Sequence, residues 1–136
     1  LKNAAYRTGG IIQYLYSLME LSDYDTALNI VETEQDHLED YADFHFACGI
    51  LFMKAIQADT KKYISYLPFI EQAYLRCLEI GEVPLHQGTN GCGSFKAAHN
   101  LATWYEVSGN LPKAKEYYQK AADQGYLPAI NRLQIL

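Results

Sequence analysis

Apolar residues recur along the whole chain at the three- and four-residue spacing of amphipathic helices. Between residues 8 and 21, for example, Ile11, Leu15 and Leu18 follow the i, i+4, i+7 pattern that places side chains on one helical face. No stretch shows the strict alternation of apolar and polar residues that is typical of a half-buried strand. The pattern predicts an all-α fold.

The clearest helical pair lies between residues 95 and 128, where Gly109 and Asn110 separate two apolar faces. Small residues face large ones across this break, as two close-packed antiparallel helices require. The block resembles a tetratricopeptide repeat, a helix-turn-helix unit of about 34 residues that must stack to bury its apolar face. Its tail, 117–133, is similar to the related Sel1-like repeat. The positions that carry the resemblance are Leu101, Ala102 and Tyr105 on the first face and Ala114, Tyr118 and Ala121 on the second.

A weaker first repeat is predicted over about 8–38. Ala27 aligns with the small contact residue of the last repeat, whereas Leu15 stands where such repeats usually have glycine. Asp23 or Asp25, in the turn between the two helices, is expected to accept hydrogen bonds from the free N–H groups of the second helix.

The second repeat is predicted over about 40–81. Gly49 is placed to allow close approach of a partner helix over 69–80, with Ala73 at the contact. Gly49 and Ala73 are about twice as far apart as the repeat requires, so either an insertion or a longer pair of helices is expected. Pro68 is expected at or near a helix start.

These assignments predict a single domain over 1–136. A glycine-rich loop over 82–94 leads into the third repeat, 95–127. The last segment, 128–136, is expected to form a helix that covers the final hydrophobic face, as helical solenoids need. The resemblance implies that antiparallel hairpins stack as a short right-handed α-α superhelix with this C-terminal cap.

Composition narrows the class of protein. The 136 residues carry a formal net charge of -5, and the basic stripe of a nucleic-acid-binding protein is absent. Three cysteines cannot all pair and none has metal-ligand spacing, which favours a reduced, cytoplasmic setting. No apolar run is long enough to span a membrane. Because the chain starts without methionine, it is expected to be a fragment of a larger protein or a processed chain.

Candidate catalytic and metal-binding groups are few. Asp23-Tyr24-Asp25 could hold a divalent metal, but a capped turn explains the same residues more simply. The histidines lack zinc-ligand spacing, and no nucleophile is paired with a base. We therefore expect no catalytic residue, no metal and no cofactor in this domain, and leave open whether the parent chain is an enzyme. The histidines are His37, His45, His86 and His99.

The glycine-rich loop allows two interpretations. Gly91, Gly93, Ser94 and Lys96 could bind an anion such as phosphate, because a glycine-rich turn that opens a helix offers free N–H groups. Alternatively, the loop is a tight connection in which Ser94 is the N-cap of the next helix. Cys92 lies in this loop and is expected to be accessible to reagents.

A partner-binding groove is expected on the first helices of the stacked pairs, which line the concave surface in repeats of this kind. Most of this groove is apolar and contains methionine, which suits an amphipathic helix or another protein surface. The alternative is that these side chains are core beneath the insertion or an adjoining domain. The residues are Ile12, Tyr16, Met19, Phe46, Ile50, Met53, Lys96, His99, Asn100, Thr103 and Glu106.

A longer resemblance covers 70–82, the glycine-rich loop and 97–121. These segments look like the helical region that follows the catalytic domain in a group of bacterial family 2 glycosyltransferases. The resemblance implies an upstream domain of GT-A type that binds a nucleotide sugar, with its catalytic residues outside this chain. The repeats would then bind acceptor, mediate dimerisation or brace the catalytic domain.

The leading expectation is a non-catalytic interaction or dimerisation domain from such a transferase. Its partners would be a protein or peptide, a second copy of the chain, or the upstream domain. Two alternatives remain open: a free-standing adaptor that binds a peptide through Lys96, Asn100 and the groove, and a small-ligand or phosphate-binding domain that uses residues 88–94.

Overall fold

The regular elements of the described residues are helices. The computed structural model describes residues 2–82 and 90–136, with side chains from Arg7 onward, and no strand occurs within these ranges. The all-α prediction is confirmed. The elements are α1 Lys2–Glu20, α2 Tyr24–Leu38, α3 Ala42–Ala58, α4 Thr60–Tyr63, the 3-10 turn η1 Ile64–Tyr66, α5 Leu67–Ile80, α6 Phe95–Val107, α7 Leu111–Asp123 and α8 Leu127–Ile135.

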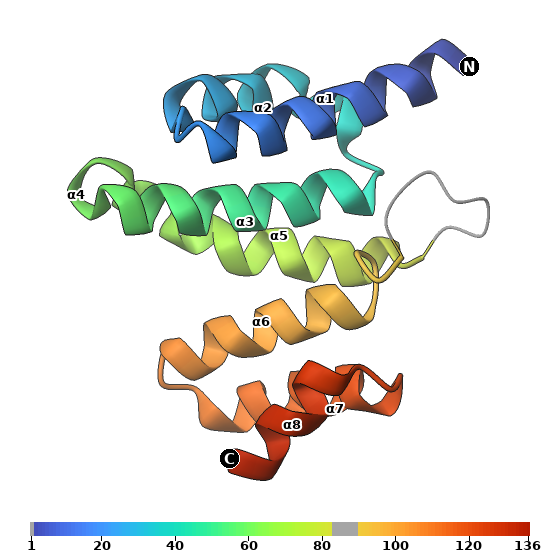
Figure 1. Ribbon diagram of the computed structural model, residues 1–136, viewed down its shortest axis with the longest axis vertical. Coiled ribbons are helices and arrows are strands. Elements are labelled where there is room, and N and C mark those ends of the chain that lie inside the picture. Colours follow the sequence, from blue (N-terminus) through green and yellow to red (C-terminus); the bar gives the residue numbers. More distant parts are fainter. Residues whose placement is uncertain (1, 83–89) are drawn as a thin grey trace.

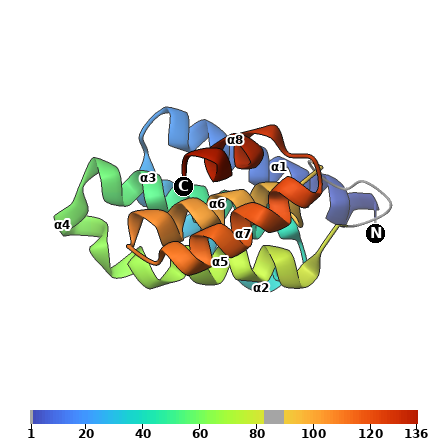
Figure 2. The same cartoon turned by 90° about the horizontal axis from the view of Figure 1, so that it is seen from below.

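The long helices run antiparallel to their neighbours and stack in two layers (Figure 1). The front layer contains α1, α3, α6 and α8, and the rear layer contains α2, α5 and α7, as the view from below also shows (Figure 2). Helix α1 packs on α2, α3 on α5, and α6 on α7, so the chain forms three hairpins followed by α8. We call the surface formed by α1, α3, α6 and α8 the front face.

Side-chain caps fix where the second helices of two hairpins begin. Asp23 Oδ1 accepts from the Thr26 amide at 3.3 Å at the start of α2, and Asn110 Oδ1 accepts from the Lys113 amide at 3.2 Å at the start of α7. Each bond satisfies one of the N–H groups that a helix leaves unpaired in its first turn. The expected cap of the first hairpin is therefore formed by Asp23.

The turns that end α6 and α7 depend on glycine. Gly109 and Gly125 have φ angles of 86° and 83°, a region that residues with a Cβ rarely adopt. The turn after α1 places Ser22 at φ 58° instead. The first hairpin therefore has a more strained connection than the third, in line with its weaker resemblance to the repeat pattern.

The extra length of the second hairpin is both a longer helix and an insertion. Helix α3 has 17 residues whereas α6 has 13, and α4 and η1 are added before α5. The insertion is tied back to α2, because Lys62 Nζ and the Tyr63 hydroxyl donate to Asp25 at 2.8 and 2.6 Å. These hydrogen bonds, from Lys62 first, lower the pKa of Asp25. Pro68 lies in the first turn of α5, as expected.

Close contact between α3 and α5 depends on Gly49. A Cβ built on Gly49 would lie 2.6 Å from Cζ of Tyr74, a distance that real side chains essentially never show. Tyr74 is 1% exposed and fills the space that the glycine leaves. The predicted close approach of α5 at Gly49 is confirmed, but the residue that meets Gly49 is Tyr74, and its neighbour Ala73 lines the groove between α2 and α5.

Helix α8 covers the end of the third hairpin, and its buried contact is Ala129. Arg132 donates to the Glu106 carboxylate through Nη2 and, at 3.0 Å, through Nε, and so ties α8 to α6. The expected terminal helix is confirmed. Among the described residues, no helix is long and apolar enough to cross a membrane.

Candidate partner-binding surfaces

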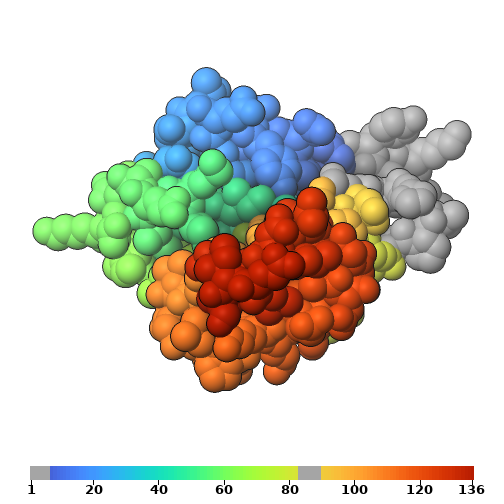
Figure 3. Space-filling model, turned by 60° about the horizontal axis from the view of Figure 1, so that its bottom comes forward, coloured from blue at the N-terminus to red at the C-terminus, as the bar shows by residue number. Residues whose placement is uncertain are grey.

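A small cavity of about 230 Å³ opens on the front face between α3 and α6. Figure 3 shows the molecule in space-filling form with α8 (red) at the front. Ile50 and Met53 provide half-buried apolar walls, and Asn100 Nδ2 donates to the Tyr74 hydroxyl at 3.4 Å across the junction. The lining residues are Ile50, Met53, Lys54, Gln57, Tyr74, Asn100 and Thr103.

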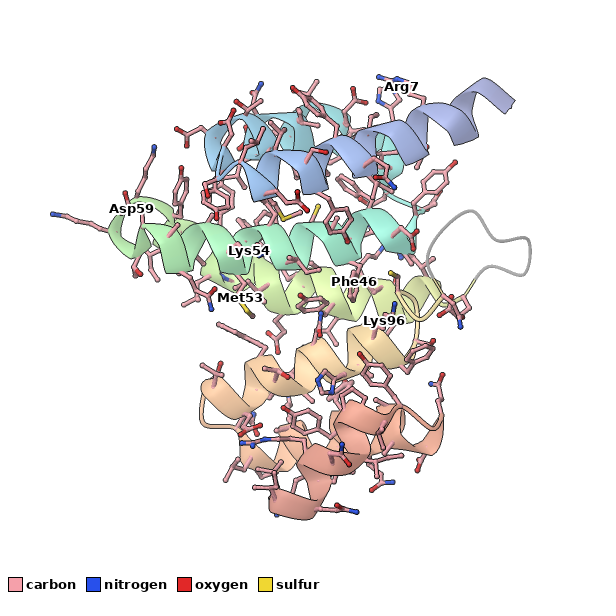
Figure 4. All side chains as sticks on the ribbon, in the orientation of Figure 1. Arg7, Phe46, Met53, Lys54, Asp59 and Lys96 are labelled. Carbon is pink, nitrogen blue, oxygen red and sulfur yellow. The ribbon has the colours of Figure 1, made fainter. Side chains whose placement is uncertain are left out.

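Two cations accompany this cavity. Lys54 is exposed at its wall, and Lys96 lies one helical turn before Asn100 on the same side of α6. Figure 4 shows Met53 and Lys54 on α3 and Lys96 at the first turn of α6. Neither lysine forms an ion pair within residues 2–82 and 90–136. Both ammonium groups are available to a carboxylate of a partner.

Four residues of the predicted groove, Ile50, Met53, Asn100 and Thr103, therefore meet around one cavity. Lys96, Ile12 and Tyr16 are half-buried. Burial is the main cause that raises the pKa of the Tyr16 hydroxyl.

Met19 and Phe46 belong to the core, where their exposed fractions are 5% and 8%. The Phe46 ring packs edge-on against Tyr74, with 5.9 Å between ring centroids. For these two residues the structure matches the core interpretation rather than the groove interpretation. The physical reason is that the neighbouring helix of each hairpin approaches closely enough to cover them.

His99 and Glu106 face the third hairpin and α8 rather than the cavity. The His99 ring packs against Tyr118 and Tyr126, with 5.3 Å between centroids in both pairs, and burial lowers the pKa of His99. Glu106 accepts from Arg132 and, at 2.8 Å, from the Tyr118 hydroxyl. The hydrogen bond from Arg132 is the main cause that lowers the pKa of Glu106.

The proposed anion loop already holds a carboxylate of this chain. Glu82 Oε1 accepts from the Gly91 amide and from the Ser94 hydroxyl, each at 2.6 Å. Ser94 stands at the N-cap position of α6, as expected, but its hydroxyl donates to Glu82 and it forms no side-chain cap bond to the helix. Gly93 abuts the backbone of Gly81. Residues 83–89, which include His86 and part of the 88–94 loop, lie outside the described residues.

Cys92 is not the accessible thiol that its loop position suggests. It is 4% exposed, and burial, followed by the nearby Asp43 carboxylate, raises its pKa to about 12. A thiol that stays protonated and covered is a poor nucleophile. Burial likewise raises the pKa values of Cys48 and Cys77. Within the part of the chain that the structure describes, no group of three acidic, histidine or cysteine side chains could hold a metal ion.

A larger groove, of about 500 Å³, lies on the opposite side of the molecule. Helices α2 and α5 form its walls, and α3 forms its floor. We call it the rear groove. Its walls and floor are mostly apolar, and Phe69 remains 45% exposed at one end. The apolar lining residues are Leu28 and Val31 from α2, Phe44, Cys48 and Phe52 from α3, and Phe69 and Ala73 from α5.

Polar side chains bridge the rear groove at its two ends. At one end the Tyr66 hydroxyl donates to Glu32 at 3.3 Å, and the Tyr66 ring stacks on Phe52 with 5.4 Å between centroids. At the other end Arg76 pairs with Glu39 at 3.2 Å, with Asp40 at 3.4 Å, and with Glu79. Sequence reasoning missed this groove because its walls come from segments that are far apart in the chain.

Comparison of the chain with protein-family models, with curated proteins and with solved structures finds no match.

Proposed function

We propose that this chain is an interaction module of tetratricopeptide type that binds an acidic peptide segment of a protein partner on its front face. The observation that carries the proposal is the front cavity, where side chains from α3, α5 and α6 converge. Stacked hairpins that present one helix of each pair to a partner are the architecture of such modules.

The front cavity offers both anchoring and orientation. Ile50 and Met53 provide apolar contact, and methionine adapts its shape to irregular partners. Asn100 and Gln57 provide hydrogen-bonding amides that can fix a peptide backbone. A cavity of about 230 Å³ accommodates one side chain of a partner rather than a whole small ligand. This size favours peptide recognition.

The lysines near the front cavity indicate which kind of peptide would bind there. Lys54 lies at the cavity wall and Lys96 one helical turn before Asn100, and neither forms an ion pair within the described residues, although the whole chain has a net charge of -5. A peptide segment with acidic side chains or a free C-terminal carboxylate would pair with these two lysines. On other faces the same segment would be repelled by the negative net charge of the chain. The interaction would be weakened by salt, because both lysines are reached by solvent.

Titration of the chain with a short peptide that carries one leucine, two glutamates and a free C-terminus tests the proposal. We expect the amide resonances of α3 and α6 around Met53 and Asn100 to shift in a saturable manner. Lys54→Glu combined with Lys96→Glu should weaken binding roughly tenfold, because each removes one attraction and adds one repulsion.

Lys115→Glu is the matched control, since Lys115 is an exposed lysine on α7, away from the cavity. It should leave binding unchanged. Equal effects of the α7 variant and the front-face variant, or shifts confined to residues away from the front cavity, would overturn the proposal. Peptide-independent self-association through Met53 in sedimentation experiments would replace the peptide with a second copy of the chain.

We also propose that the module belongs to a bacterial family 2 glycosyltransferase. Support comes from the sequence resemblance over 70–82 and 97–121 alone. In such a protein the front face would receive a segment of the acceptor or of the catalytic domain. The sequence of the complete gene product tests this: a GT-A domain with its own acidic metal motif supports the assignment, and a gene product without one contradicts it.

A further inference from the structure

The rear groove is an open apolar junction between two hairpins. It lies between α2 and α5 and does not overlap the front cavity, which is lined by other residues. Phe69 and its aromatic neighbours Phe52 and Tyr66 form a cluster at one end, with ring centroids 5.4 to 6.2 Å apart. An aromatic cluster that is still partly exposed is a typical anchoring point for a partner.

The rim of the rear groove is strongly acidic. Arg76 is met by the carboxylates of Glu39, Asp40 and Glu79, and Glu32 adds a fourth carboxylate at the other end. One guanidinium against four carboxylates leaves an excess of three negative charges around an apolar floor. The partner that complements such a surface is apolar on one side and positively charged at its edges.

We propose that the rear groove binds a basic amphipathic helix of a protein partner. The α2 wall runs from Leu28 to Glu39, which corresponds to about 16 Å of helix at 1.5 Å per residue. A helix of about three turns would fill that length. Its apolar residues lie on Phe69 and the α3 floor, and its lysines or arginines pair with Glu32 and with the carboxylates around Arg76.

A helix is preferred over an extended strand because the groove offers no free backbone edge. Both walls and the floor are helices whose backbone groups are already paired within α2, α3 and α5. Recognition therefore comes from side chains alone. Helix-in-groove binding uses apolar anchors at helical spacing, and the aromatic cluster and Ala73 provide sites for them.

The test uses the whole chain and a designed peptide of about 14 residues with a leucine face and lysine edges. A second peptide with glutamate in place of lysine is the charge control. Calorimetry and amide shift mapping should show binding of the lysine peptide at α2 and α5. Binding should weaken as salt rises from about 50 to 300 mM, because the rim charges are exposed.

Two substitutions separate the charge from the apolar contact. Glu32→Lys should weaken binding of the lysine peptide roughly fivefold, since an attraction becomes a repulsion. Phe69→Ala should weaken it roughly tenfold through loss of the aromatic anchor. Glu116→Lys on α7 makes the same charge change away from the groove and should leave affinity unchanged. Circular dichroism of each variant checks that the helices are intact.

Each of the following outcomes would contradict the proposal. Equal affinity for the glutamate peptide would remove the charge argument, and shifts confined to residues around Met53 and Asn100 would move the site to the front face. Glu32→Lys and Glu116→Lys with equal effects would show binding by general attraction to an acidic chain. Self-association that Phe69→Ala abolishes, with no peptide binding, would make a second copy the occupant. The front-face proposal stands or falls separately, because its peptide has the opposite charge.

Discussion

The two junctions between consecutive hairpins are built differently. Between the second and third hairpins, the Tyr74 hydroxyl accepts from Asn100 and the Tyr105 hydroxyl donates to Glu71, and only a cavity of about 230 Å³ remains. Between the first and second hairpins, α2 and α5 stay apart over a groove of about 500 Å³ and are bridged at its ends by Tyr66 and Arg76.

This difference shows that a few side chains determine whether the junction between two hairpins is closely packed or open. Gly49 lets the Tyr74 ring pack inside the second hairpin, from which the Tyr74 hydroxyl reaches Asn100 of the third hairpin. In the first junction polar bridges hold the helices at a distance, and apolar surface remains uncovered below them. Closed packing stabilises the fold, whereas the open junction leaves the apolar surface that we propose as a binding site.

Truncation of two aromatic residues on α5 should break this comparison most strongly. Tyr74→Ala should lower the free energy of unfolding by about 4 kcal/mol, because it leaves a cavity in closed packing. Phe69→Ala should cost only about 1 kcal/mol, since Phe69 is 45% exposed in the open junction. Urea denaturation followed by circular dichroism measures both. Similar losses would show that the two junctions are packed alike.

A methyl group added at Gly49 tests the α3–α5 contact that holds Tyr74 at the closed junction. Gly49→Ala should destabilise the chain by about 2 to 3 kcal/mol, because the new Cβ collides with the Tyr74 ring. Gly10→Ala on α1 is the matched control, since nothing lies within 4 Å of its Cβ position. That change should stabilise by about 0.5 kcal/mol through helix propensity. A neutral Gly49→Ala would mean that α3 and α5 can separate without cost.

Removing the hydroxyl group of Tyr105 and, separately, that of Tyr66 compares the side-chain hydrogen bonds that cross the two junctions. Tyr105 donates to Glu71 at 2.6 Å across the closed junction, and Tyr66 donates to Glu32 at 3.3 Å across the open one. Tyr105→Phe should cost about 1.5 kcal/mol, because a buried hydrogen bond to a carboxylate is lost. Tyr66→Phe should cost less than about 0.5 kcal/mol, because solvent replaces the exposed bond. Thermal denaturation can rank the two, and a reversed order would contradict the comparison.

Acid should loosen α8 by protonating Glu106. The hydrogen bond from Arg132, then that from Tyr118, lowers the pKa of Glu106 below its unfolded value of about 4.3. The contribution to stability is therefore complete above that value and is lost as pH falls through the lower, folded pKa. Hydrogen exchange of α8 amides should accelerate in that range.

Glu106→Gln is the variant that checks this assignment. It should raise α8 exchange already at neutral pH and flatten its acid dependence, while exchange in α3 and α5 stays unchanged. Acid loosening of α8 that persists in the variant would point to another carboxylate.

Local features could be predicted from the sequence where a single residue type has one physical role. Gly49 indicated close helix contact, and Asp23 indicated a helix start, because small residues and cap residues act over a few neighbours. The sequence indicated less exactly which face of its helix each side chain lies on. His99 and Glu106 lie on a stripe of α6 adjacent to that of Lys96 and Asn100, and α8 covers it.

The rear groove could not be predicted in the same way. Its width depends on how the first hairpin sits on the second, which the α4–η1 insertion helps to set through Asp25. Its polar bridges join residues more than thirty positions apart, such as Arg76 and Asp40. Periodicity reports which face of a helix is apolar, but not which neighbouring helix covers that face.

The most direct test of a module with two binding surfaces is a titration with both peptides together, followed by amide resonances of the chain. The acidic peptide should shift amides around Met53 and Asn100, and the basic helix should shift amides of α2 and around Phe69. Because the two peptides would attract each other, each is first titrated alone and their mutual affinity is measured separately. We predict that saturation with one leaves the other's set of shifts unchanged. If both peptides shift the same set of resonances, the account is contradicted. It is also contradicted if one peptide displaces the other from the chain more than their affinity for each other explains.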